Sequence, residues 1–465
     1  MTGTPLTLAD KIWNAHRVAS TAAGSDLIAI DRVFLHERTG ASALRSMAAA
    51  GRPVRDPKRV FAVMDHIVDT RIGRNDNKGG DQTLMQGGQA FITETRAAAH
   101  AAGITLFDVT DPDQGITHVI SPELGIVLPG CTLVAPDSHT CTQGALGALA
   151  WGIGSSEAEH AMATGVLRLP RPKTMRVTFT GELPLGVTAK DMALALISAH
   201  GAGGGAGHVV EFAGPAVEAL EIEARMTLCN MATEFSAMAG LIAPDAKTYA
   251  YLAGRRYAPA SFNGAYWDNL RSDEGAVFDR EIIVDDASLK PMVTWGTSPQ
   301  HAIPIDAPVP QGPQRVHDYI GLAAGDRLEG TPIDVAFLGS CTNARLSDLR
   351  RAAALIQGRK IAPTIQKALV VPGSGAVKRA AEAEGLDEIF RAAGFEWRES
   401  GCSLCFFAGG EAFPAGSRSI SSTNRNFEGR QGPGIRTHIA SPEVVVASAL
   451  AGVIADPRHL AGDKA

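Results

Sequence analysis

The chain has 465 residues, a formal net charge of −6 and 45% hydrophobic residues. This length fits about three domains, and the composition excludes a disordered or coiled-coil chain. The acidic balance gives no electrostatic footprint for nucleic acid, and no run of about 18 apolar residues could cross a membrane. Six cysteines are too few for a disulfide framework. We therefore expect a soluble, cytoplasmic protein with reduced cysteines.

Helix and strand signals alternate from the N-terminus onward. Thr7 can cap a first helix, and a longer amphipathic helix is expected to stop at Gly103. Three apolar runs with polar ends predict buried strands, at residues 27–37, 59–66 and 133–140. Such a strand-helix rhythm favours parallel sheets, whose ligands bind at the carboxyl ends of the strands. The polar ends of these strands are thus the expected place for chemistry.

The cysteines give the most specific signal. Cys402 and Cys405 lie three positions apart in "GCSLC", and Cys341 lies in "GSCTN" where a strand gives way to a helix, a position that should favour the thiolate. The close pair could be incidental, but it lacks the helix of a redox pair and the second pair of a zinc site. The remaining interpretation is an iron-sulfur cluster with three cysteine ligands and one open iron. Core packing is expected for Cys131, Cys141 and Cys229.

Motifs spread over nearly the whole chain resemble the aconitase family of hydro-lyases, especially the large subunits of its two-chain dicarboxylate dehydratases. The most specific pair is "GSCTN" with the later C-x-x-C, and "NRNFEGR" strengthens it. Further matches are "DHIVDT", "GITHV", "PDSHT", "AGGGAGHVVEFAG", "MTLCNMATE", "VPGSGAVK" and "AGFEWRESGCSLC".

The resemblance implies a three-domain α/β architecture of parallel-containing sheets flanked by helices, with the active site at the domain interface. The domains are expected at residues 1–170, 171–295 and 296–465. One 4Fe-4S cluster per chain would be held by Cys341, Cys402 and Cys405, its fourth iron free to bind substrate. A swivelling fourth domain would lie on a separate small subunit and supply the base that removes the carbon-bound proton, so this chain should be inactive alone.

The resemblance also assigns acid-base and substrate-binding side chains. Asp65 and His66 match the pair that protonates the leaving hydroxyl. Two further pairs are implied, His118 with Asp137 and His139 with Glu234. Arginines suit substrate carboxylates because the planar guanidinium binds them in a bidentate manner. The expected substrate-binding residues are His36, Asn230, Asn424, Arg425 and Arg430.

Two segments depart from the leucine-biosynthesis members of the family. These are "FFAGGEAFPAG" after Cys405 and "DTRIGRNDNKGGDQ" after the Asp-His pair. They leave open a paralogue that acts on a related hydroxy acid, such as 2-methylmalate (from citraconate), dimethylmalate or homoaconitate. From other classes, an iron-free RNA-binding form is disfavoured by the acidic charge, and a thiol redox protein predicts a colourless chain with a titratable disulfide.

Overall fold

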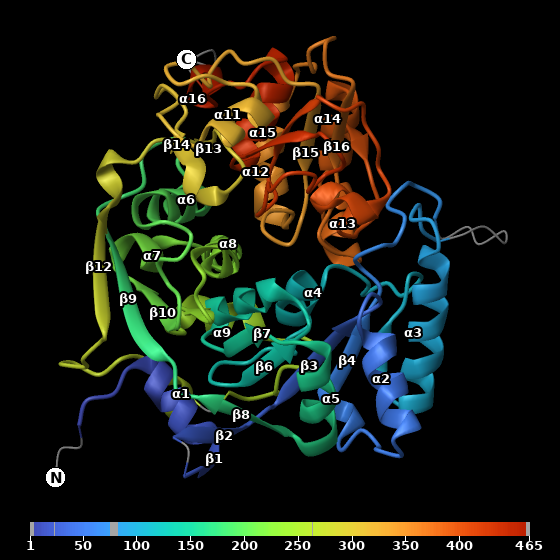
Figure 1. Ribbon diagram of the computed structural model, residues 1–465, viewed down its shortest axis with the longest axis vertical. Coiled ribbons are helices and arrows are strands. Elements are labelled where there is room, and N and C mark those ends of the chain that lie inside the picture. The colour runs from blue at the N-terminus through green and yellow to red at the C-terminus, as the bar shows by residue number, and fades with distance from the viewer. Residues whose placement is uncertain (1–3, 23, 75–81, 263, 462–465) are drawn as a thin grey trace.

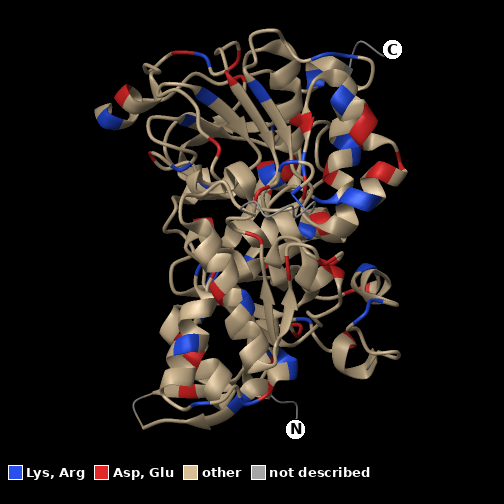
Figure 2. Ribbon diagram, turned by 90° about the vertical axis from the view of Figure 1, so that its right-hand side faces the viewer, with Lys and Arg blue, Asp and Glu red and all other residues tan. Residues whose placement is uncertain are grey.

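The computed structural model describes residues 4–22, 24–74, 82–262 and 264–461. Three large sheets dominate these residues, one each in the N-terminal, middle and C-terminal parts of the chain, and Figure 1 shows them grouped around a common centre. Helices flank the sheets, so the architecture is α/β, as the sequence predicts. Among the described residues, no helix combines the length and apolar character that crossing a membrane requires. Figure 2 shows basic and acidic residues intermixed along the helices.

The N-terminal sheet has five parallel strands in the order β5-β4-β3-β6-β7. Because helices and the rest of the chain cover both of its faces, its inner strands are nearly continuous apolar runs. The helix α3 ends where predicted, since Gly103 takes a left-handed φ of 66°. The elements are β3 (Arg32–His36), α2 (Gly40–Ala49), β4 (Val60–Val63), α3 (Gly88–Ala102), β5 (Thr105–Phe107), α4 (Thr117–Glu123), β6 (Thr132–Ala135), β7 (Leu149–Gly152) and α5 (Ser155–Thr164).

The predicted single strand at residues 27–37 is wrong, because the run forms two strands in different sheets. The chain turns at the half-buried Asp31, whose carboxylate accepts a hydrogen bond from the Thr132 amide at 3.0 Å. Ahead of this turn, β2 (Ser25–Ala29) joins a small antiparallel sheet with β1 (Arg17–Ser20) and β8 (Val166–Pro170). The first helix, α1 (Leu8–His16), is capped by Thr7 as predicted.

The middle sheet has four parallel strands in the order β11-β10-β9-β12. Two of its helices, α6 and α8, reach the centre of the molecule, α6 packing beside α8. The elements are β9 (Lys173–Thr180), α6 (Ala189–His200), β10 (His208–Ala213), α7 (Pro215–Ala219), α8 (Ile222–Asn230), β11 (Ala239–Leu241), α9 (Ala246–Leu252), α10 (Gly264–Asp268) and β12 (Arg280–Asp285).

The C-terminal sheet has five parallel strands in the order β17-β16-β15-β18-β19. A hairpin of β13 (Met292–Thr294) and β14 (Ala302–Pro304) precedes it and crosses the domain limit expected at residue 296. The remaining elements are α11 (Gln314–Ile320), β15 (Val335–Leu338), α12 (Leu346–Ile356), β16 (Lys367–Val370), α13 (Gly375–Ala383), α14 (Leu386–Ala393), β17 (Glu396–Trp397), β18 (Arg418–Ser421), β19 (Arg436–Ile439), α15 (Pro442–Ala451) and α16 (Arg458–Ala461).

The polar segments singled out in the sequence follow the carboxyl ends of strands in two sheets. His36 ends β3, and His66 and Asp137 lie just after β4 and β6 in the N-terminal sheet. Cys341 follows β15, and Arg425 follows β18 in the C-terminal sheet. Since the carboxyl ends of parallel strands share one edge of a sheet, these short strands bring the residues together.

Candidate active site

A cavity of about 390 Å³ lies between the carboxyl ends of the N-terminal and C-terminal sheets. Its walls are unusually rich in histidine, cysteine and arginine. It collects eleven of the residues that the sequence singled out: His36, His66, His118, Asp137, His139, Cys341, Cys402, Cys405, Asn424, Arg425 and Arg430.

His66 lies between two carboxylates. Its Nδ1 is 2.5 Å from Asp65 Oδ1, and its Nε2 is 3.0 Å from Asp137 Oδ2. A ring whose two nitrogens both face carboxylates must donate from both, which requires the cation. Burial by itself lowers the pKa of His66, but the Asp65 and Asp137 charges outweigh burial and raise this pKa well above 6.5. The imidazole of His66 is therefore protonated at neutral pH and fixed in orientation, so it can act as a proton donor.

Asp137 contacts three histidines rather than the one that the sequence paired with it. Its Oδ1 is 3.1 Å from His118 Nε2 and accepts a hydrogen bond from the His139 amide at 2.8 Å. Its Oδ2 faces His66. Burial alone raises the pKa of Asp137, but the histidines outweigh burial and hold this pKa well below its usual range. The carboxylate is thus the electrostatic centre of the histidine group.

The expected His139–Glu234 contact is present, and Arg425 extends it. His139 Nε2 is 2.7 Å from Glu234 Oε1, and Arg425 Nε lies 2.7 Å from the same oxygen. Burial alone raises the pKa of Glu234, but His139 and Arg425 together lower it. Arg425 is therefore oriented by a buried carboxylate, with its side chain 29% exposed towards the cavity.

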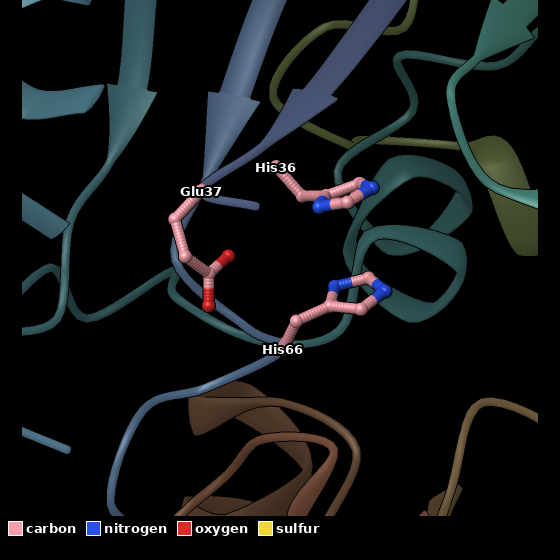
Figure 3. A group of neighbouring side chains, drawn as sticks. All are labelled: His36, Glu37 and His66. Atoms are coloured by element: carbon pink, nitrogen blue, oxygen red, sulfur yellow. The ribbon is translucent and has the colours of Figure 1, made fainter. Parts of the chain in front are cut away.

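His36 packs on His66, as Figure 3 shows, with ring centroids 4.0 Å apart and planes 18° from parallel. The Arg38 amide donates to His36 Nδ1 at 3.3 Å, so Nε2 carries the proton and donates to Pro136 O at 3.0 Å. Burial, with the neighbouring His66 charge, lowers the pKa of His36 to about 4. His36 is therefore a neutral ring stacked on a cationic one.

The neutral state of His36 makes stability depend on pH. As pH falls below 6.5, His36 becomes protonated in the unfolded chain, but in the folded chain it stays neutral until pH is near 4. The free energy of unfolding of the wild type therefore decreases as pH falls through this range. We expect His36→Gln, which does not titrate, to gain ~3 kcal/mol relative to wild type between pH 7 and 4. Urea unfolding of the iron-free chains at both pH values measures it. A difference that stays constant with pH would contradict the neutral assignment.

Glu37 was not singled out from the sequence, although it follows His36 directly. Figure 3 shows its carboxylate beside His66. Glu37 Oε2 accepts from the Asp65 amide at 3.1 Å, and Oε1 accepts from the Ile67 amide at 2.7 Å, so one carboxylate fixes the backbone on both sides of His66. Burial, together with the Asp65 charge, raises the pKa of Glu37 to about 7. Its oxygens are committed to the backbone and not to a ligand.

The three cysteines predicted to act together are free, buried and face the same cavity. Cys341 Sγ accepts from Asn230 Nδ2 at 3.2 Å and from Asn424 Nδ2 at 3.3 Å. Cys405 Sγ lies 3.3 Å from Ser340 Oγ and accepts from Arg430 Nη2 at 3.5 Å. Hydrogen bonds to sulfur stabilise a thiolate, so the bond from Asn230 opposes the effect of burial on the pKa of Cys341 without outweighing it.

The expectation that a helix N-terminus favours the Cys341 thiolate is wrong. The helix α12 begins only at Leu346, and residues 340–342 form a turn. Burial, together with the nearby Cys405, raises the pKa of Cys341 to about 12. Thiolates this close and this buried need a compensating cation, which a bound metal centre would provide.

Backbone strain concentrates at the cysteine loops. Three non-glycine residues of the described chain have positive φ, and two of them adjoin cluster-motif cysteines: Ser340 at 80° and Ser403 at 46°. A Cβ on Gly409 would lie 2.0 Å from Ser403 O, so only glycine fits against this loop. Strained conformations persist where surrounding structure imposes them, often at functional sites.

Asn230 and Asn424 differ in their access to the cavity. Asn230 is fully buried and does not line it, and its amide is bonded to Thr142, Thr342 and Cys341. This placement does not support the direct substrate contact that the sequence assigned to Asn230. Asn424 does line the cavity, and its buried Oδ1 has no hydrogen-bond partner. A buried acceptor without a partner is unusual and marks Asn424 as a candidate functional residue.

Comparison with known proteins now gives these contacts a family context. The model of the aconitase family (aconitate hydratase) matches residues 10–452, nearly the whole chain. The chain belongs to the aconitase family. Aconitase-family membership makes the chain a hydro-lyase by class, in a family whose members typically depend on an iron-sulfur cluster.

A curated relative within the aconitase family narrows the comparison. The "3-isopropylmalate dehydratase large subunit 1" of Bradyrhizobium diazoefficiens is 50% identical over 472 residues, covering 98% of this chain and 97% of the relative. The alignment therefore covers nearly the full length of both chains.

The donor set fits the cluster of this family. Three buried free thiols face one cavity, amide, hydroxyl and guanidinium groups lie around two of the sulfurs, and no described disulfide competes for them. The cavity also contains residues that motif reasoning missed, among them Arg38 and Phe406. The guanidinium of Arg38 lies 5.4 Å from the centre of the Phe406 ring, and that of Arg430 lies 5.3 Å from it. Phe406 thus orients two cations at the cavity wall.

Proposed function

We propose that this chain is the large, catalytic subunit of a cytoplasmic 3-isopropylmalate dehydratase, which interconverts 2-isopropylmalate and 3-isopropylmalate in leucine biosynthesis. The full-length 50% identity to a large subunit of that name supports the substrate. The observation that carries the chemistry is one cavity that combines three free thiols, a cationic histidine between two carboxylates, and arginines.

Cys341, Cys402 and Cys405 would hold one 4Fe-4S cluster per chain. With three protein ligands, such a cluster would supply a Lewis acid for departure of the substrate hydroxyl. Asn230 and Asn424 then act as positioning residues for the Cys341 sulfur, through the contacts described above. Asn424 can also contact substrate, because it lines the cavity.

His66 would protonate the leaving hydroxyl. Hydroxide is a poor leaving group, and proton transfer from a held cation lowers the barrier to its departure. Asp65 fixes one ring nitrogen, so the proton on Nε2, which faces Asp137 at 3.0 Å, is the one available to the cavity. His118 and His139 would hold the Asp137 carboxylate anionic and in place.

Arg425 and Arg430 would bind the substrate carboxylates, with His36 forming the floor beside His66. The first arginine is pre-oriented by Glu234 and the second by Phe406 and Cys405, so little side-chain entropy is lost on binding. The base that removes the carbon-bound proton would come from a small subunit, as the large-subunit name of the relative suggests. We therefore expect no turnover from this chain alone.

The substrate assignment is tested by assaying the chain with its small subunit, cluster reconstituted, against a panel of acids. We expect the highest kcat/KM with 3-isopropylmalate, compared with 2-methylmalate, dimethylmalate and homoaconitate. A clear preference for one of the other three acids would contradict the substrate assignment but not the proposed dehydratase chemistry. Each partner assayed separately provides the control, and both should be inactive.

A further inference from the structure

Lys190, near the start of α6, has a fully buried ammonium that faces no carboxylate at ion-pair distance among the described residues. Its Nζ donates to Thr423 O at 2.6 Å, to Ser422 O at 2.9 Å and to Asn343 Oδ1 at 3.3 Å. These three contacts use all three ammonium hydrogens. The buried charge is thus satisfied by neutral acceptors alone.

The three acceptors belong to two of the loops that line the cavity, the one that contains Cys341 and the one that contains Asn424 and Arg425. Asn343 lies two residues after Cys341, while Ser422 and Thr423 immediately precede Asn424 and Arg425. Asn343 is itself held by Asp348 and Thr227, so the lysine joins an existing network of hydrogen bonds. One side chain of the middle sheet's helix therefore ties together both loops of the C-terminal sheet.

Burying an ammonium is unfavourable unless negative charge or good hydrogen bonds compensate for it. Burial lowers the pKa of Lys190 to about 7, and negative charge on Cys341 is the largest influence that opposes this lowering. A bound cluster with three thiolates carries net negative charge, so a nearby ammonium and the cluster stabilise each other.

We propose that Lys190 is a positioning residue that ties the Cys341 loop and the Asn424–Arg425 loop to α6 and places a buried positive charge beside the cluster. The electrostatic part of this role rests on the proposed cluster, whereas the hydrogen bonds that tie the two loops to α6 do not depend on it. Without the ammonium, both loops lose a shared anchor, whether or not iron is bound. Iron retention and loop mobility should therefore change together.

Lys190→Met removes the charge while keeping an unbranched side chain. Lys247→Met is the control, because Lys247 Nζ likewise makes three hydrogen bonds, to the backbone carbonyls of Glu218, Ala219 and Leu220, but contacts neither of these two loops. After anaerobic cluster reconstitution, each protein is exposed to an iron chelator, and loss of the cluster is followed by the absorbance at roughly 400 nm. We expect Lys190→Met to lose iron about 10-fold faster or more, and Lys247→Met to match wild type.

Hydrogen-deuterium exchange of the iron-free chains provides the second readout. Peptides that contain residues 340–345 and 420–426 should exchange faster in Lys190→Met than in wild type, with the rest of the chain unchanged. Equal iron loss and equal exchange in the two proteins would overturn the proposal. If wild type itself binds no iron, the proposed function fails, while the exchange experiment still decides whether the anchor exists. Should Lys190→Met not fold, Lys190→Gln, which keeps a donor without charge, takes its place.

Discussion

Replacing Cys341 by alanine should abolish both the bound cluster and the activity of the assembled enzyme. The cavity offers three thiols, and two of them cannot hold a cluster with one open iron. Loss of the Lewis acid removes several kcal/mol of transition-state stabilisation, so we expect turnover to fall by on the order of 10³-fold or more. Iron and sulfide content, measured beside the rate, shows whether the two losses coincide.

Cys131→Ala is the matched control, because Cys131 is a half-buried free cysteine that does not line the cavity. It should keep full iron content and wild-type turnover. If Cys341→Ala retained wild-type activity, the assignment of this thiol as a cluster ligand would be wrong. Equal loss in the control would point instead to a general effect of removing a cysteine.

The second large effect is expected from His66→Gln in the assembled enzyme. Removing the proton donor should lower kcat by about 10²- to 10⁴-fold, with little change in KM and with the cluster retained. Glutamine also leaves Asp65 and Asp137 without the cation between them, which should cost about 3–5 kcal/mol of stability. Steady-state kinetics and urea unfolding measure the two effects separately.

The pH dependence distinguishes loss of a proton donor from simple misfolding. Because the pKa of His66 is raised well above 6.5, the wild-type kcat should stay high through neutral pH and fall as pH rises through that raised pKa. The residual kcat of His66→Gln should lack this alkaline fall. His100→Gln, at an exposed position on α3, should follow the wild-type profile. An unchanged alkaline fall in His66→Gln would assign the titration to another group.

Local sequence rules predicted much of the fold because the strands and helices have strong local signals. Apolar runs predicted β4 and β6, although both strands end before the polar residues that the prediction included, and the Thr7 and Gly103 caps placed helix ends correctly. The failure at residues 27–37 has a long-range cause, since the bond between Asp31 and the Thr132 amide joins positions 101 residues apart. Periodicity within a short window contains no information on such a contact.

The candidate site also contains some residues that could be predicted from the sequence and others that could not. Motif residues such as Cys341 and His66 carry distinctive chemistry and could be named from the sequence, and the cavity brings them together. Glu37 and Lys190 could not be singled out from the sequence, because acidic and basic residues usually face solvent. Their significance depends on tertiary contacts, namely the two amides beside His66 and the carbonyls before Asn424. The segment after the Asp-His pair that departs from the family includes residues 75–81, which lie outside the described residues.

The central claim is that three thiols of this chain hold a cluster with one iron left for substrate. Mössbauer spectroscopy of the anaerobically purified, iron-57-enriched chain with its small subunit tests this claim most directly. We expect about four iron and four sulfide per large subunit, with one iron whose signal shifts when 3-isopropylmalate is added. A chain without iron or sulfide, or a cluster whose four irons all remain unaffected by every acid that is turned over, would contradict the account.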